Sequence, residues 1–122
     1  MESLLILRTA SALFALAALG GLIMAGMRFN GSPRPPSWLA MGHGFLAAAG
    51  LTLLIFGALT VGIPVMAQVG LGLFCLAAAG GAALNLLFHS KQLPLPISLM
   101  MAHALLAVTG FVVLLLSSFS GI

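Results

Sequence analysis

The feature that most constrains this chain is the near absence of charged side chains from its long apolar runs. No Asp, Glu, Lys or Arg lies between Arg34 and Lys91, and none follows Lys91. Only 4% of the 122 residues are charged, whereas a soluble domain carries about 25%. This chain therefore has too few charged side chains to form a water-exposed surface. Runs of about 20 apolar residues suffice to cross a bilayer as helices. The sequence therefore predicts an integral membrane protein, surrounded by lipid.

Turn-forming segments divide the apolar sequence into four predicted helices. The interruptions read MRFNGSPRPP, TVGIP and HSKQLPLP, and each contains proline or glycine. Because these connections are short, consecutive helices should be antiparallel neighbours in an up-down bundle. The predicted fold is an all-α, four-helix transmembrane bundle that forms a single domain over residues 1–122. The predicted spans cover residues 4–27, 37–59, 64–88 and 97–119, and Pro64 is expected in the first turn of the third.

The second half of the chain repeats the first at an offset of sixty residues. The string LFALAALGG at residues 13–21 returns as LFCLAAAGG at 73–81, and the match continues without a gap into the following helix. A first helix that belongs to the repeat is expected to be retained rather than cleaved as a signal peptide. The repeats span about residues 4–60 and 64–120, and each is a two-helix hairpin. Both copies then cross the membrane in the same sense, related by a pseudo-twofold axis along its normal.

One histidine occurs at the same place in each repeat. His43 lies seven residues after Pro36, and His103 seven after Pro96, so both imidazoles should lie about 10 Å below the same membrane surface. Small residues follow on the same helix face, and glycine pairs on the first and third helices are expected at the same depth. These positions are Ala47, Gly50, Ala107, Gly110, Gly20, Gly21, Gly80 and Gly81. The pattern predicts a slot in which two imidazoles hold one flat object from both sides.

Histidines on the second and fourth helices, with glycines on the first and third, resemble the cytochrome b subunit of respiratory complexes and other small four-helix b-type cytochromes of membranes. The resemblance implies one haem b, with His43 and His103 as axial metal ligands and the glycine pairs as the places where the porphyrin approaches the backbone. It also implies electron transfer between membrane partners such as a quinone and a redox protein, with no catalytic side chain. Whether the chain is itself an enzyme stays open. The chain departs from cytochrome b in having one such histidine per helix, which limits the expectation to one haem.

The few basic residues predict the orientation. Arg28, Arg34 and Lys91 lie in the connections after the first and third helices, and the connection after the second carries no charge. The positive-inside rule therefore places the charged loops and the histidine end in the cytoplasm, as in a bacterial inner membrane. The same three cations are candidates for pairing with haem propionates, or they act as topology signals alone. Arg8 is expected to reach the opposite interface by snorkelling.

Other interpretations of the histidines stay open. If the chain is a cofactor-free structural or assembly subunit of a larger complex, the histidines serve as polar contacts between helices. A homodimer is also open. A Cu(I) site is the second alternative, because thioethers lie in the histidine half of the chain. These methionines are Met24, Met27, Met41, Met100 and Met101. His89 has no counterpart in the first repeat, and it is expected to be an ordinary interfacial residue, with a proton or quinone role as the alternative.

Composition also excludes two classes of structure. Four basic residues are too few for a nucleic-acid-binding surface. A single cysteine, Cys75, excludes an internal disulfide, and we expect it to act as a small packing residue.

Overall fold

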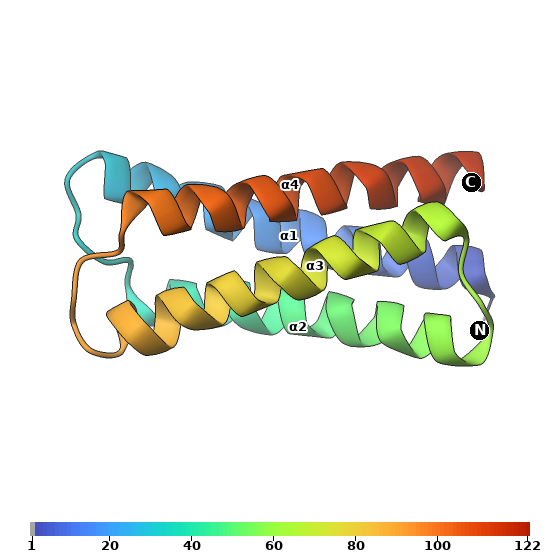
Figure 1. The fold of residues 1–122 in the computed structure, drawn as a ribbon, viewed down its shortest axis with the longest axis horizontal. Helices are drawn as coiled ribbons and strands as arrows, with labels where there is room; N and C mark the ends of the chain where they lie inside the picture. Colours follow the sequence, from blue (N-terminus) through green and yellow to red (C-terminus); the bar gives the residue numbers. More distant parts are fainter. Residues whose placement is uncertain (1) are drawn as a thin grey trace.

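The structure is a computed structural model that describes residues 2–122, and four long helices account for most of it (Figure 1). All four are long and apolar enough to span a membrane, which confirms the expected all-α transmembrane bundle. No strand occurs among the described residues. The elements are α1 (Ser3–Phe29), α2 (Ser37–Thr60), α3 (Val65–Leu84), the π-helical turn η1 (Asn85–His89) that continues α3, and α4 (Ile97–Ser120).

Proline and glycine set the helix ends. Pro36, Pro64 and Pro96 are the residues that precede α2, α3 and α4. Proline suits this place because its φ is fixed near the helical value and it has no N–H to leave unpaired. Pro64 was expected inside the first turn, and it lies one residue earlier. Gly62 and Gly121 follow α2 and α4 with φ of 79° and 73°, the left-handed conformation in which helices commonly stop.

The four helices run alternately up and down, as predicted (Figure 1). The connections 30–36 and 90–96 lie at one end of the bundle, which we call the loop end. Both termini and the turn between α2 and α3 lie at the other, the terminal end (Figure 1). Contacts are most extensive within the pairs α1–α2 and α3–α4, and the two hairpins meet along α1–α4 and α2–α3. Helices α2 and α4 are therefore diagonally opposite each other.

Equivalent residues of the two hairpins meet at the centre of the bundle. Phe14 stacks on Phe74 with ring centroids 3.7 Å apart and parallel planes. Leu54 and Leu114, also equivalent, are both fully buried. Residues related by a twofold axis touch each other only beside that axis, so the axis passes between the two phenyl rings. The arrangement supports the pseudo-twofold relation expected from the repeat.

The apolar side chains divide between this centre and the outer surface. The main buried cluster surrounds the phenyl pair and consists of Leu7, Ala10, Phe14, Leu54, Ile63, Ala67, Phe74 and Leu114. Many large apolar side chains face outward, among them Trp38, Phe45 and Leu105. An apolar outer surface is what lipid requires, and close packing of small residues then holds the helices together.

Candidate functional site

His43 and His103 face each other across the twofold axis. Their ring centroids are 6.1 Å apart, and the ring planes make an angle of 77°. Each imidazole lies six residues after the first residue of its helix, α2 or α4, or about 9 Å along the helix. The equal depth expected from the prolines is therefore present. The diagonal arrangement of α2 and α4 turns two matched positions into a facing pair.

Each imidazole is fixed by a hydrogen bond within its own hairpin. His43 Nδ1 donates to the carbonyl oxygen of Ala17, and His103 Nδ1 donates to that of Ala77, both at 2.7 Å. A carbonyl oxygen only accepts, so Nδ1 carries a proton in each ring, and in the neutral form of the ring Nε2 then carries a lone pair. No residue of the described chain forms a hydrogen bond with either Nε2. Metal-binding histidines commonly have this arrangement, with one ring nitrogen donating to a carbonyl and the other free for the metal.

The glycine pairs lie directly against the imidazoles. A Cβ placed on Gly21 would be 3.1 Å from His43 Cε1, and one on Gly81 would be 3.1 Å from His103 Cε1. At the preceding glycine of each pair, a Cβ would be 3.7 and 3.5 Å from the Cβ of the same histidine. The four glycines are therefore at the expected depth. In this structure their neighbour is the imidazole of their own hairpin, and contact with a porphyrin stays a prediction.

The small residues that follow each histidine pack partly against the phenyl pair. A Cβ on Gly50 would be 2.9 Å from Phe14 Cε2, and one on Gly110 would be 3.5 Å from Phe74 Cδ1. These glycines lie seven residues beyond the histidines, about 10 Å toward the terminal end. The phenyl pair therefore closes the expected slot on that side. Sequence reasoning missed this pair, although both phenylalanines occur at the repeat offset.

Ala47 and Ala107 occupy the turn between the imidazoles and the phenyl pair, and both are half-buried.

The methionines of the copper hypothesis are more dispersed. Met41 and Met101 are 55% and 49% exposed, and Met100 is buried in a second apolar cluster near the loop end. The copper hypothesis depended on thioethers turned toward the histidines, and these three positions give it no support.

Two basic residues link the first hairpin to the connection 90–96, although Arg28 lies in the last turn of α1 rather than in the connection where it was expected. Arg28 Nε donates to the carbonyl oxygen of Leu95 at 2.9 Å. Arg34 Nη1 donates to the carbonyl oxygen of Gln92 at 2.7 Å. Lys91 is exposed. Two of the three expected propionate partners therefore bind the backbone of the opposite connection, each with part of its guanidinium group. Their pairing with a propionate stays a prediction.

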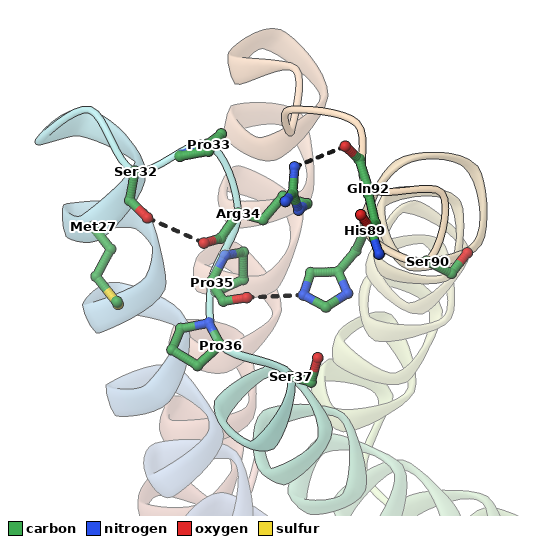
Figure 2. A pocket seen from close by; sticks show the side chains of 10 residues that line it. All are labelled: Met27, Ser32, Pro33, Arg34, Pro35, Pro36, Ser37, His89, Ser90 and Gln92. Carbon is green, nitrogen blue, oxygen red and sulfur yellow. Dashed lines mark hydrogen bonds between the residues drawn. The ribbon is translucent and has the colours of Figure 1, made fainter.

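His89 lies apart from the imidazole pair, in the π-helical turn η1. Its Nε2 donates to the carbonyl oxygen of Pro35 at 2.9 Å, which links α3 to the first connection (Figure 2). The equivalent turn of α1 stays α-helical. Sequence reasoning did not predict this difference.

At the terminal end, Arg8 is exposed, with its guanidinium 5.2 Å from the centroid of the Phe119 ring and its Nε 3.5 Å from the Ser118 carbonyl oxygen. This position agrees with the expected reach toward the second interface.

Cys75 is exposed on α3 rather than packed inside, so the expectation of a packing role within the bundle is wrong. The sequence places Cys75 near the middle of its helix and does not indicate which face it occupies.

Together these features define a class: a four-helix membrane-spanning bundle with internal twofold symmetry and two facing imidazoles on its axis. Comparisons of the chain with protein-family models, curated proteins and solved structures give no match.

Proposed function

We propose that this chain is a membrane b-type cytochrome that binds one haem b through His43 and His103 and transfers electrons. The observation that carries the proposal is the separation of the two imidazole rings, 6.1 Å between centroids. Two imidazoles on opposite sides of one metal ion, with metal–nitrogen bonds of about 2 Å, have ring centroids about 6 Å apart. The distance supports a site for one iron ion, in which each Nε2 would be turned toward the opposite ring.

The donor set also suits haem. A porphyrin would itself supply four nitrogen ligands to the iron, so this chain would need to contribute only His43 and His103. The hydrogen bonds to the Ala17 and Ala77 carbonyls fix the orientation of the rings and increase the basicity of each Nε2. When bound, haem would supply a one-electron centre, and ligation by both His43 and His103 would favour electron transfer over oxygen activation. The phenyl pair lies on the terminal side of the imidazoles, within the main buried cluster.

The surroundings of the site suggest the remaining parts of the function. Arg28, Arg34 and Lys91 all belong to the loop end, where they can pair with haem propionates. Under the positive-inside rule this end faces the cytoplasm of a bacterial cell. The electron donor and acceptor are then a quinone in the bilayer and a redox protein at its surface.

A specific observation favours a second candidate, a cofactor-free structural or assembly subunit of a larger membrane complex. Each imidazole already fills the space above Gly21 or Gly81 and is bonded to the backbone of its own hairpin. Packing and one hydrogen bond then account for each histidine without a ligand. Such bonds between membrane helices contribute about 0.6 kcal/mol on average.

Absorption spectra of purified variants decide between the two candidates. The wild-type chain, His43→Ala, His103→Ala and His89→Ala are produced in haem-replete cells and measured oxidised and then reduced with dithionite. We expect a sharp reduced α-band in the wild type that disappears in the first two variants. His89→Ala is the matched control, because it also loses an imidazole bonded to a carbonyl, at 2.9 Å, and should keep the band.

A further variant separates loss of a ligand from loss of folding. Methionine is also an axial haem ligand, so His43→Met should retain haem with a shifted reduction potential, whereas His43→Ala loses it. A colourless wild type with normal stability would favour the structural subunit. A band that survives in both His43→Ala and His103→Ala would contradict the proposed ligands.

A further inference from the structure

An open cavity of about 560 Å³ lies at the loop end, between the connection 30–36 and the end of α3 (Figure 2). Its polar lining includes Arg34, Ser37, His89 and Gln92 with two further serines, and three prolines of the connection and one methionine complete it. The two sides of the cavity come from different hairpins. The hydrogen bonds from His89 to Pro35 and from Arg34 to Gln92 cross between them, so the cavity is already built in the folded chain.

The permanent charge in the lining of this cavity is positive. Its lining contains a guanidinium group and several hydroxyl groups but no carboxylate. The only acidic residue of the sequence, Glu2, immediately precedes α1 at the terminal end (Figure 1). The positive charge of Arg34 attracts an anion and repels a cation, and a neutral ligand has only hydrogen bonds to gain there.

Hydrogen-bond donors remain available in the cavity. Arg34 uses Nη1 for the Gln92 carbonyl, and a guanidinium has further N–H groups that can bind a ligand. Helix α2 begins at Ser37 without a side-chain cap, so the first N–H groups of the helix and its positive dipole end lie at the cavity wall. Guanidinium groups and helix N-termini both commonly bind phosphate in proteins.

The cavity also marks the place where the two repeats differ. The residue equivalent to Arg34 is Pro94, and the residue equivalent to His89 is Phe29. The imidazole pair and the phenyl pair are common to both repeats, but the polar lining occurs once. The cavity is therefore a feature of this chain beyond its duplicated scaffold.

We propose that this cavity binds a phosphate group, carried either by an anionic membrane lipid or by a soluble phosphate compound. Arg34 and the first turn of α2 at Ser37 contact the phosphate oxygens, and His89 acts as a positioning residue because it holds the Pro35 carbonyl. The cavity lies at the helix ends, the level of lipid headgroups, where basic pockets between transmembrane helices bind phosphorylated headgroups. The proposal does not depend on haem.

The single tryptophan gives a direct probe, because Trp38 follows Ser37 and the chain has no tyrosine. The full chain is placed in phosphatidylcholine vesicles that contain equal fractions of either brominated phosphatidylglycerol or brominated phosphatidylcholine. Stronger quenching of Trp38 by the brominated anionic lipid identifies the lipid as the source. A saturable change in Trp38 fluorescence on adding inorganic phosphate at constant ionic strength, in phosphatidylcholine alone, identifies the soluble source.

Three variants make the test specific. Arg34→Gln should lower the preference about five-fold, the factor expected for one cation at a membrane surface. Lys91→Gln removes the same charge from the same end but outside the cavity, and should leave the preference nearly unchanged. Ser37→Asp places a negative charge where it favours helix α2 but repels phosphate, so binding should be lost in a fully folded chain.

The proposal is overturned if neither arm gives a response. It is also overturned if Arg34→Gln and Lys91→Gln have equal effects, since the attraction would then come from general surface charge. Retained binding in Ser37→Asp would show that phosphate does not occupy the cavity. An anionic-lipid or phosphate response that Arg34→Gln and Ser37→Asp both abolish supports the assignment.

Discussion

Replacing Gly50 with alanine places a methyl carbon 2.9 Å from Phe14 Cε2, 3.0 Å from Cδ2 and 3.1 Å from Cζ. Phe14 is only 6% exposed, and its ring is stacked on Phe74 with centroids 3.7 Å apart. The ring therefore has no free direction in which to move without displacing its partner. The new methyl group has to push α2 away from α1, or disturb the phenyl pair on the twofold axis.

The size of this effect follows from two opposing terms. An extra methyl group forced into a packed core costs about 1–3 kcal/mol. Alanine in place of glycine within a helix recovers up to about 1 kcal/mol. Gly44→Ala on the same helix is the matched control, because a Cβ there meets no atom within 4 Å. The difference between the two variants isolates the clash, and Gly50→Ala should be less stable than Gly44→Ala by about 1–3 kcal/mol.

The free energy of unfolding is measured in mixed micelles with an increasing mole fraction of SDS. We expect Phe14→Leu in the Gly50→Ala background to regain part of the lost stability, since leucine lacks the ring that meets the methyl group. If Gly50→Ala is as stable as Gly44→Ala, Phe14 does not occupy the space above Gly50, and the packing described for the twofold axis is refuted.

Three further predictions concern other contacts. Leu114→Ala should lower the free energy of unfolding by about 2–5 kcal/mol, because Leu114 is fully buried. Leu105→Ala, at a position that is 70% exposed, should change it little, and equal costs would contradict the assigned core. Ser11→Ala removes a buried 3.0 Å hydrogen bond to Ser118 and should cost about 0.6 kcal/mol in the same assay; an unchanged midpoint would show that the bond contributes nothing. Arg28→Gln removes a 2.9 Å bond to the opposite connection and should increase amide hydrogen exchange there, which unchanged exchange would disprove.

The bundle itself could be predicted because lipid leaves few choices. Uncharged runs of sufficient length fix the four spans. The observed helix ends lie within two residues of the predicted ones when η1 is counted as the end of α3. Pro36 and Pro96 fix where α2 and α4 begin, and the helical rise then fixes the depth of His43 and His103. These inferences need only the local sequence and the rise per residue of an α-helix.

The group that packs against each glycine pair could not be predicted in the same way. A glycine at histidine depth is required whether a porphyrin or an imidazole approaches it, so the pattern at Gly21 and Gly81 is the same in both cases. The stacking of Phe14 on Phe74 depends on where the twofold axis passes, which sequence periodicity does not determine. The hydrogen bond between His89, in the π-helical turn, and the Pro35 carbonyl joins segments that are distant in the sequence. Such features follow from tertiary contacts rather than from local pattern.

The haem and iron content of the purified wild-type chain tests most directly whether His43 and His103 hold a cofactor. The chain is produced in haem-replete cells, purified in mild detergent and quantified against its single tryptophan. We predict one low-spin haem b per chain, with a sharp α-band on reduction. A chain that contains neither iron nor haem, and that fails to bind added haem in detergent, would contradict the proposed cytochrome and leave the imidazoles as packing contacts.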